Sequence, residues 1–331
     1  MEKIRYNCVS NNRKGIMAKR RRLKKSVKRF LIGFILGVGL LIGGIKTYNN
    51  IMYKKTYEYK FLEKNYTINE FKIIDKLDKE EKNVLLEKEY NKNIPLLINE
   101  KYFMFKNLDR YLDYQEKNNN LELKDIVSLV NVNRDKDFYK DLEVTDVSNI
   151  NEMLVNKYHA LDKDYVAPDI VKCSSTYAYA NNELNKEAYV AFKNMADAAK
   201  EEGHIILILS SYRTYESQDN LWKQRKTAYG IKKADAYAAR AGSSEHETGL
   251  AIDVAEYKDV NDEFGKTESF KWMQENAYKY GFILRYPEGK ENITGYSYEA
   301  WHYRYLGVSL ATKVYNEGIT YDEYYEFYLN K

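Results

Sequence analysis

The sequence is poor in cysteine, proline and histidine. It contains two cysteines, three prolines and four histidines in 331 residues, against 33 tyrosines. Cys8 lies in an N-terminal tail and Cys173 in the main body, so the body has no internal disulfide and depends on its core for stability. A chain of this length forms one or two domains with cores of their own.

Negative charge is nearly absent from residues 1–29. This segment has twelve lysines and arginines and a single acid, Glu2, for a net charge of +11, although the whole chain carries only +4. The rest of the chain therefore sums to −7, and a mildly acidic body argues against nucleic-acid binding. We predict a basic cytoplasmic tail over residues 1–29 and no nucleic-acid partner.

Polar side chains are missing from Phe30 to Ile45. A helix of this length spans roughly 24 Å, against about 30 Å for the hydrocarbon core of a bilayer. The positive-inside rule places the tail in the cytoplasm and the chain after residue 48 outside. We predict a single-pass signal-anchor over residues 30–48 in a bacterial cell membrane. A cleaved signal peptide is the alternative, but no small-x-small cleavage site follows the run.

Five of the 16 glycines fall in this apolar run. Gly33 with Gly37 and Gly39 with Gly43 have the spacing that packs transmembrane helices closely, so a weak homodimer through this helix is one interpretation. Because glycine is so frequent here, such pairs arise easily by chance and the spacing is weak evidence.

Glycine is absent from residues 56–142, and proline occurs there only as Pro95. Apolar residues recur at helical spacing, which predicts several helices rather than a sheet; examples are Leu62, Phe71, Ile74, Leu77, Leu108, Tyr111 and Leu112. We interpret residues 49–143 as an extracytoplasmic helical stalk or accessory region, with a ligand-binding module as the alternative.

Residues 144–331 alternate between helix and strand patterns. Amphipathic or polar runs predict helices over 182–202, 216–227, 233–241 and 268–280, with Gly203 and Gly281 ending the first and last of them. Aliphatic or alternating runs predict strands over 205–209, 249–254 and 282–286. This order predicts an α+β domain with a small, mainly antiparallel sheet flanked by helices.

Two short motifs, Ser243–Asp253 and Glu299–His302, contain the residues of a catalytic metal site. His246 and Asp253 can converge on one ion if the loop between them reverses, and His302 completes a set of three ligands. Three protein ligands leave a fourth position open, as in catalytic zinc sites, although other divalent metals also bind such ligands. Glu299 is the expected general base. The motifs therefore predict a hydrolase with one Zn²⁺.

The same residues resemble a known family. Ser244-x-His246-x-x-Gly249-x-Ala251-x-Asp253 and Glu299-x-Trp301-His302 are similar to the two signatures of the VanY-type zinc D-alanyl-D-alanine carboxypeptidases, in the LAS group of peptidoglycan metallopeptidases. The resemblance covers about residues 145–331. It implies a LAS metallopeptidase-like fold, zinc bound by His246, Asp253 and His302, and a catalytic Glu299.

A further segment, Ser211 to Thr214 with Gln218, resembles the family's substrate-binding segment. The resemblance implies that Arg213, Gln218 and Ser244 face the terminal D-alanine. A guanidinium also binds a free carboxylate with bidentate geometry, which is what a carboxypeptidase requires. Ala241 and Ala300 stand where many members have proline, and neither change removes a chemical group.

These observations predict a membrane-anchored zinc carboxypeptidase that removes the C-terminal D-alanine from peptidoglycan stem peptides. The resemblance favours D,D-specificity, with L,D-carboxypeptidase or peptidoglycan endopeptidase activity as alternatives. A non-catalytic wall-binding or scaffold protein with a structural metal is the alternative from another class, and the presence of Glu299 argues against it. Glu245 and Glu247, on either side of His246, are expected to be solvated.

Overall fold

The computed structural model describes residues 24–256 and 263–330. The chain divides into two compact units, with the boundary between Tyr90 and Asn91. Most of the predicted basic tail, including Cys8, lies outside the described residues. The domain limits predicted from the sequence stay predictions.

The first unit contains one long apolar helix, α1 (Lys25–Tyr53), which includes the predicted span 30–48. Its mean hydropathy reaches 2.0 over an 18-residue window, and none of that window is buried within the protein. The helix is therefore long and apolar enough to cross a membrane, a description that an N-terminal signal sequence also meets.

Three short helices follow in the same unit: α2 (Tyr57–Glu63), α3 (Ile68–Ile74) and α4 (Lys79–Glu87). Thr67 and Asp78 begin α3 and α4 with capping boxes, in which Glu70 and Glu81 bind the N-cap backbone in return. Apolar side chains of these helices form a small interior, comprising Phe61, Tyr66, Phe71, Ile74 and Leu85. The prediction of helices in this region is confirmed.

The second unit begins with three more helices, α5 (Asn93–Ile98), α6 (Leu108–Lys117) and α7 (Leu123–Asn131). This part of the chain contacts the C-terminal segment. The ring of Tyr102 stacks on Phe327 with centroids 4.0 Å apart. Ser128 Oγ donates a hydrogen bond to Glu323 Oε1 at 2.5 Å. The helices before the sheet are thus tied to the helices after it.

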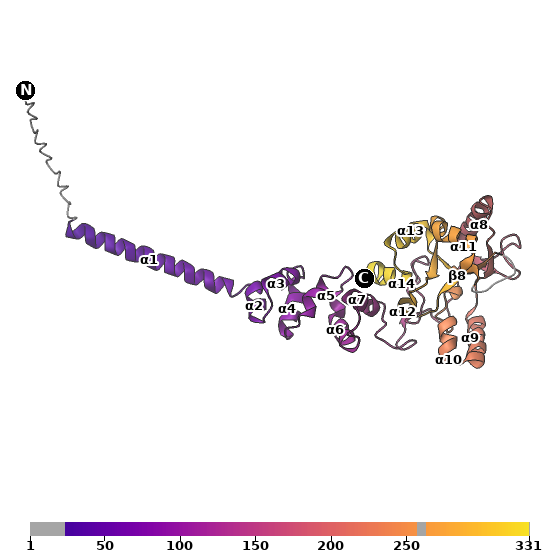
Figure 1. The fold of residues 1–331 in the computed structure, drawn as a ribbon, viewed down its shortest axis with the longest axis horizontal. Coiled ribbons are helices and arrows are strands. Elements are labelled where there is room, and N and C mark those ends of the chain that lie inside the picture. The colour runs from indigo at the N-terminus through magenta and orange to yellow at the C-terminus, as the bar shows by residue number, and fades with distance from the viewer. Residues whose placement is uncertain (1–23, 257–262, 331) are drawn as a thin grey trace, which may run out of the picture. The chain divides into compact units, whose positions relative to one another are not determined.

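A four-stranded antiparallel sheet forms the centre of the second unit (Figure 1). Its spatial order is β5 (Leu207–Ser210), β6 (Ala251–Ala255), β8 (Glu299–Tyr305) and β7 (Phe282–Tyr286). Two small pairs lie outside it: β1 (Glu143–Val144) with β2 (His159–Ala160), and β3 (Ile170–Lys172) with β4 (Glu183–Asn185). The predicted α+β class with a small antiparallel sheet is confirmed.

Helix α8 (Lys186–Glu201) shares the main core with the sheet. Phe192 is fully buried, and its ring lies 6.3 Å from that of Phe282 in β7. The predicted start of this helix at residue 182 is wrong, because β4 occupies the intervening residues. The side chain of Asn185 accepts hydrogen bonds from the first backbone N–H groups and so begins the helix there.

The remaining helices surround the sheet and connect its strands. They are α9 (Tyr215–Tyr229), α10 (Ile231–Tyr237), α11 (Glu268–Asn276), α12 (Glu291–Thr294), α13 (Gly307–Glu317) and α14 (Tyr321–Tyr324). Figure 1 shows α9 and α10 side by side as a helical hairpin. The helix predicted over 233–241 starts earlier and ends at Tyr237, where the backbone becomes extended. Strand β8 was not predicted.

Regular pairing of β6 with β8 and a register shift between β7 and β8 bring distant motif residues together. Asp253 in β6 and His302 in β8 are direct cross-strand partners. Between β7 and β8 the pairing shifts, so that Leu284 faces Tyr303 but Tyr286 faces Glu299. The extra residues in β8 form a bulge, which changes the direction of the strand's side chains next to the site.

Glycines with positive φ fix the ends of two elements. We expect Gly203→Ala to lower the free energy of unfolding by about 1 kcal/mol, because its φ of +89° is unfavourable for alanine although no atom lies within 4 Å of an added Cβ. In Gly281→Ala the φ of +88° is equally unfavourable for alanine, and the added Cβ would also lie 3.0 Å from the backbone of Gly307. We expect a further loss of about 1–3 kcal/mol there.

Urea unfolding of the two variants measures this difference. Since the two φ angles agree within one degree, Gly203→Ala is the matched control for backbone strain. Equal losses in both variants would contradict the close packing of Gly281 at the entry to β7.

Candidate functional site

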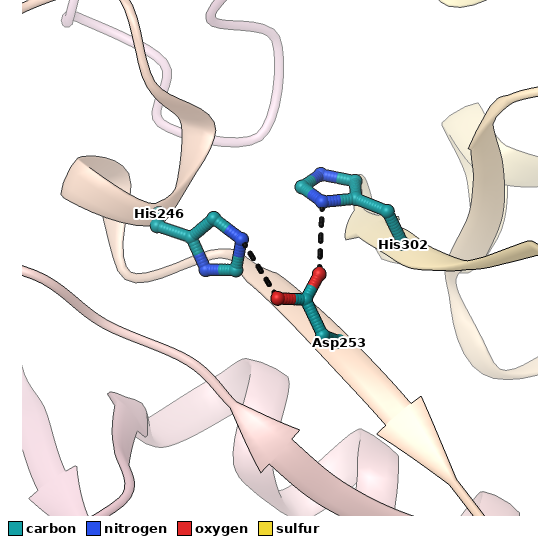
Figure 2. A group of neighbouring side chains, drawn as sticks. All are labelled: His246, Asp253 and His302. Carbon is teal, nitrogen blue, oxygen red and sulfur yellow. Dashed lines mark hydrogen bonds and ion pairs between the residues drawn. The ribbon is translucent and has the colours of Figure 1, made fainter. Parts of the chain in front are cut away.

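Three buried side chains from different elements meet at the two central strands of the sheet (Figure 2). His246 lies in a 3-10 turn (Glu245–Thr248), Asp253 in β6 and His302 in β8. Each offers one nitrogen or oxygen atom, and these atoms lie within 4.8 Å of one another. His246 Nε2 is 3.4 Å from Asp253 Oδ2, and His302 Nδ1 is 3.1 Å from Asp253 Oδ1. The three sequence-predicted ligand residues are therefore neighbours.

The turn that carries His246 brings it back over β6. Gly249 ends this turn in the left-handed conformation, at φ 70° and ψ 14°. The strand then starts two residues later, at Ala251. A side chain is unfavourable at such a φ, so glycine allows the reversal that the sequence analysis required.

The outer nitrogen of each imidazole has its own partner. His246 Nδ1 lies 2.7 Å from the carbonyl oxygen of Ser211, and His302 Nε2 lies 3.3 Å from Glu245 Oε2. Both partners are acceptors, so both outer nitrogens carry protons and donate them. The inner nitrogens, His246 Nε2 and His302 Nδ1, are thereby directed at the carboxylate of Asp253. Such outer partners fix the tautomer and orientation of metal-binding histidines.

The two imidazoles and the carboxylate influence one another's ionisation. Burial opposes ionisation of Asp253, but the neighbouring His246 and His302 outweigh it and hold its pKa well below the usual range. Burial alone would lower the pKa of His302, yet its hydrogen bonds to Asp253 and Glu245 raise that pKa to about 9. The group of three residues thus combines a carboxylate that stays ionised, Asp253, with an imidazole that is readily protonated, His302.

Glu299 lies beside this group as a separate acid. Its Oε2 is 3.7 Å from His302 Nδ1, and the side chain is buried. Burial raises the pKa of Glu299 to about 7, against an opposing effect of the His302 charge. The bulge in β8 explains why Glu299 and His302, three positions apart, border the same cavity.

Glu245 belongs to the candidate site, and sequence reasoning missed this. The prediction that it is solvated is wrong, because only 2% of it is exposed. Its Oε1 accepts hydrogen bonds from Arg285 Nε at 2.8 Å and Arg304 Nη1 at 3.1 Å, while its Oε2 faces His302. The two guanidinium groups overcome the effect of burial and hold the pKa of Glu245 below its usual range.

The arginines are themselves fully buried and paired. Arg285 also binds both carboxylate oxygens of Asp322, and Asn156 Nδ2 donates to Asp322 Oδ1 at 2.8 Å. Arg304 Nη2 donates to the carbonyl oxygen of Met153 at 3.0 Å. Arg285 and Arg304 each lie in a strand among mostly apolar residues. Arginines at such positions were the signal in the sequence that an acid is buried nearby.

Glu247 is also buried, so its predicted solvation is wrong as well. It forms no ion pair with an arginine in the described part of the chain, although the charge of Arg213 acts to lower its pKa. Instead, its two carboxylate oxygens accept the backbone N–H of Gly242 at 2.9 and 3.1 Å. Burial raises the pKa of Glu247 to about 7. Its neighbours therefore stabilise its charge far less than those of Glu245 do.

The predicted substrate residues lie next to the three-residue group. Arg213 Nη2 is 3.3 Å from Asp253 Oδ2 and 2.7 Å from Ser210 Oγ, while its Nη1 donates to Gln218 Oε1 at 3.2 Å. Gln218 Nε2 is held by the carbonyl oxygen of Ala239 at 2.8 Å. Arg213, Gln218 and Ser244 all line the same cavity as the candidate metal residues.

This cavity has a volume of about 620 Å³. Its lining comes from β5, β6 and β8 and from the hairpin of α9 and α10. Trp301 is half-buried on its wall. The cavity is large enough for several residues of an extended peptide beside the polar centre.

Comparisons with known proteins give a consistent answer. Residues 181–308 match the family model VanY, described as D-alanyl-D-alanine carboxypeptidase. The Bacillus subtilis (strain 168) protein YodJ is 41% identical over 180 residues, which make up 52% of this chain and 66% of YodJ. The Enterococcus gallinarum protein VanXYC, a bifunctional D-Ala-D-Ala dipeptidase and D-Ala-D-Ala carboxypeptidase, is 34% identical over 53% of this chain and 93% of its own length.

A solved structure resembles the second unit as well. The LdcB LD-carboxypeptidase, described with the molecular basis of peptidoglycan recognition, has a TM-score of 0.53 and 39% sequence identity. The match covers 58% of this chain and 94% of that protein. The chain thus spans slightly less than two thirds of YodJ but nearly all of VanXYC and LdcB.

The buried charges predict that substitutions of Glu245 and of Glu247, on either side of His246, differ clearly in their effect on stability. Glu245→Gln leaves Arg285 and Arg304 without their shared anion, and we expect a loss of about 3 kcal/mol or more in the free energy of unfolding. Glu247→Gln keeps an acceptor for the backbone N–H of Gly242, and we expect a loss below about 1 kcal/mol.

Urea unfolding at pH 6 compares the two variants. At that pH Glu247 is mostly neutral, since its pKa is about 7, whereas Glu245 is ionised. The two substitutions make the same change, from carboxylate to carboxamide, at two buried positions on either side of His246, so a similar loss in both would contradict the charge network around Glu245.

Proposed function

Because the chain belongs to the family of VanY D-alanyl-D-alanine carboxypeptidases, we propose that it is a zinc carboxypeptidase that removes the C-terminal D-alanine from peptidoglycan stem peptides. One observation carries the proposal. Two imidazole nitrogens and a carboxylate oxygen lie within 4.8 Å of one another, in a cavity that also contains a separate acid and an arginine. Each of these groups has a distinct part in amide hydrolysis.

His246, Asp253 and His302 are the residues that would hold the zinc ion. The donor set fits zinc, because it combines two imidazoles with a carboxylate and leaves a further coordination position for substrate or water. To hold the metal, His302 would have to lose its Nδ1 proton, while its hydrogen bond to Glu245 would keep the other proton on His302 Nε2. Zinc in such a site polarises a carbonyl group and makes water more acidic.

Glu299 acts as the general base and acid. Its carboxylate lies near His302 Nδ1 without belonging to the three-residue group. It takes a proton from the attacking water and then delivers that proton to the nitrogen of the departing D-alanine. A carboxylate already engaged as a ligand would serve less well.

Arg213 binds the carboxylate at the end of the peptide. Its guanidinium reaches into the cavity between Gln218 and Asp253, and paired N–H donors match a carboxylate better than an ammonium group does. Gln218 and Ser244 complete the pocket for the terminal residue. A requirement for a free C-terminus separates a carboxypeptidase from an endopeptidase.

We propose D,D-specificity, which the family model and the name of the VanXYC relative support. Similarity to the LdcB LD-carboxypeptidase supports L,D-specificity as the second candidate. The two activities act on different stereoisomers of the residue before the scissile bond. Alanine release from two peptides that differ only in this stereocentre decides between them.

Helix α1 anchors the protein in the bacterial membrane in this proposal, with the basic tail in the cytoplasm and the second unit outside. The length and hydropathy of α1 support a membrane span, and the charge of residues 1–29 supports the orientation. The stem peptides of peptidoglycan lie on the outer side of the membrane, where this orientation places the catalytic residues.

Replacement of the general base tests the mechanism. We expect Glu299→Gln to lower kcat for D-alanine release by about 10²- to 10⁴-fold, because the proton acceptor is lost. Its zinc content, measured by atomic emission, should stay that of the parent. Glu288→Gln, at an exposed position outside the cavity, is the control. Full activity in the Glu299 variant would reject its assigned role.

Replacement of Arg213 tests recognition of the C-terminus. We expect the parent protein to hydrolyse a peptide with a free C-terminal carboxylate and to leave the C-terminal carboxamide nearly intact. Arg213→Gln should raise KM for the free acid by about tenfold or more, since a charge-assisted contact is lost. Cleavage of both peptides at equal rates by the parent would favour an endopeptidase.

A further inference from the structure

The cavity continues beyond the candidate metal residues along one face of α9. Gln218, Leu221, Arg225 and Tyr229 line it in succession, at the spacing of three and four positions that places side chains on one side of a helix. Gln218 contacts Arg213 at the inner end. Tyr229 is the last residue of α9 and marks the outer end. This face therefore forms a path from the site toward solvent.

Positive charge is concentrated at the outer end of this path. Arg225 of α9 and Lys233 of α10 both line the cavity and are exposed. Neither forms an ion pair in the described part of the chain, and Lys233 Nζ lies 5.0 Å from the ring centroid of Tyr229. The two cations are thus available to an anion that enters the cavity.

The carboxylates of the cavity lie at its inner end. Of the lining residues that the structure describes, the acidic ones are Glu245, Asp253 and Glu299. All three lie against His302, at 3.3, 3.1 and 3.7 Å from its ring nitrogens. The charge of Arg225 is one of those that lower the pKa of Glu299, but none of the three carboxylates forms an ion pair with Arg225 or Lys233 in the described part of the chain.

The hairpin that carries the cations is firmly held. Asp235 of α10 accepts hydrogen bonds from Trp222 Nε1 of α9 at 2.9 Å and from Arg240 Nη2 at 2.8 Å. The buried Lys157 donates to the carbonyl oxygen of Asp235 at 2.5 Å. These bonds connect both helices to the body of the unit, so the backbone positions of Arg225 and Lys233 are fixed.

We propose that Arg225 and Lys233 form a second anion subsite, which binds a free carboxylate about three residues before the C-terminus of the peptide substrate. Arg225 follows Gln218 by seven positions, or about 10 Å along a helix. An extended peptide covers about 3.3–3.6 Å per residue, so this distance corresponds to about three residues. The inference rests on the proposed function, because it takes Arg213 and Gln218 as the pocket for the terminal residue.

The experiment uses two synthetic peptides with the same D-alanyl-D-alanine end. They differ at the residue three positions before the C-terminal D-alanine. This residue carries a free side-chain carboxylate in one peptide and the corresponding carboxamide in the other. We expect the full-length zinc-loaded protein in detergent to prefer the carboxylate peptide by about fivefold to tenfold in kcat/KM, as for two exposed charge pairs. The preference should decline as salt is added.

Matched variants assign this preference to the subsite. The double variant Arg225→Gln/Lys233→Gln should lose the preference while its kcat/KM for the carboxamide peptide stays within about twofold of the parent. The control, Lys226→Gln/Lys232→Gln, removes the same charge from the same two helices at exposed positions that do not line the cavity. It should keep the preference. Equal loss in both variants, or no preference in the parent, would overturn the inference.

A binding measurement separates this inference from the proposed activity. Calorimetry with the zinc-loaded Glu299→Gln variant compares the affinities of the two peptides without turnover. Tighter binding of the carboxylate peptide, lost when Arg225 and Lys233 are also replaced, supports the subsite even if neither peptide is hydrolysed. Equal affinities overturn the subsite, whereas failure of hydrolysis alone overturns the proposed function.

Discussion

The site depends on one buried carboxylate that is contacted by two arginines and a histidine. Glu245 accepts hydrogen bonds from Arg285 and Arg304 and faces the outer nitrogen of His302. Burial of two arginines is tolerable only because anions share their charge, and Asp322 supplies the second of these. The same carboxylate orients the His302 ring so that Nδ1 points at Asp253. Stability of the interior and geometry of the centre therefore rely on one residue.

The pairing of strands in the sheet brings the residues of the site together. Antiparallel pairing puts Asp253 directly opposite His302 on the two central strands, and the glycine turn brings His246 back to them. In a regular strand, Glu299 and His302 would point to opposite faces, since three positions is an odd spacing. The bulge in β8 removes this obstacle. The acid can then stay close to the imidazole without joining the three-residue group.

The sequence was sufficient to predict features that neighbouring residues determine. It was insufficient for features that depend on residues far apart in the chain. Gly203 located the end of α8 and Gly281 the start of β7, and the two histidine motifs identified the three-residue group. Strand β8 escaped prediction because its bulge breaks the alternation that marks a strand. The solvation expected for Glu245 and Glu247 failed for another reason. Their burial depends on Arg285, Arg304 and Gly242, partners whose proximity arises only in the fold.

The cavity itself is electrically divided. Its inner end holds three carboxylates around one histidine, and its outer end holds Arg225 and Lys233, neither of which forms an ion pair among the described residues. In the proposed complex, a peptide held by Arg213 alone could still rotate about its terminal residue, so the scissile bond would sample many positions. The proposed second anchor about three residues away would restrict this freedom before reaction, and orientation of this kind accelerates the chemical step rather than binding alone. The charge division along α9 would thus contribute to catalysis as well as to recognition.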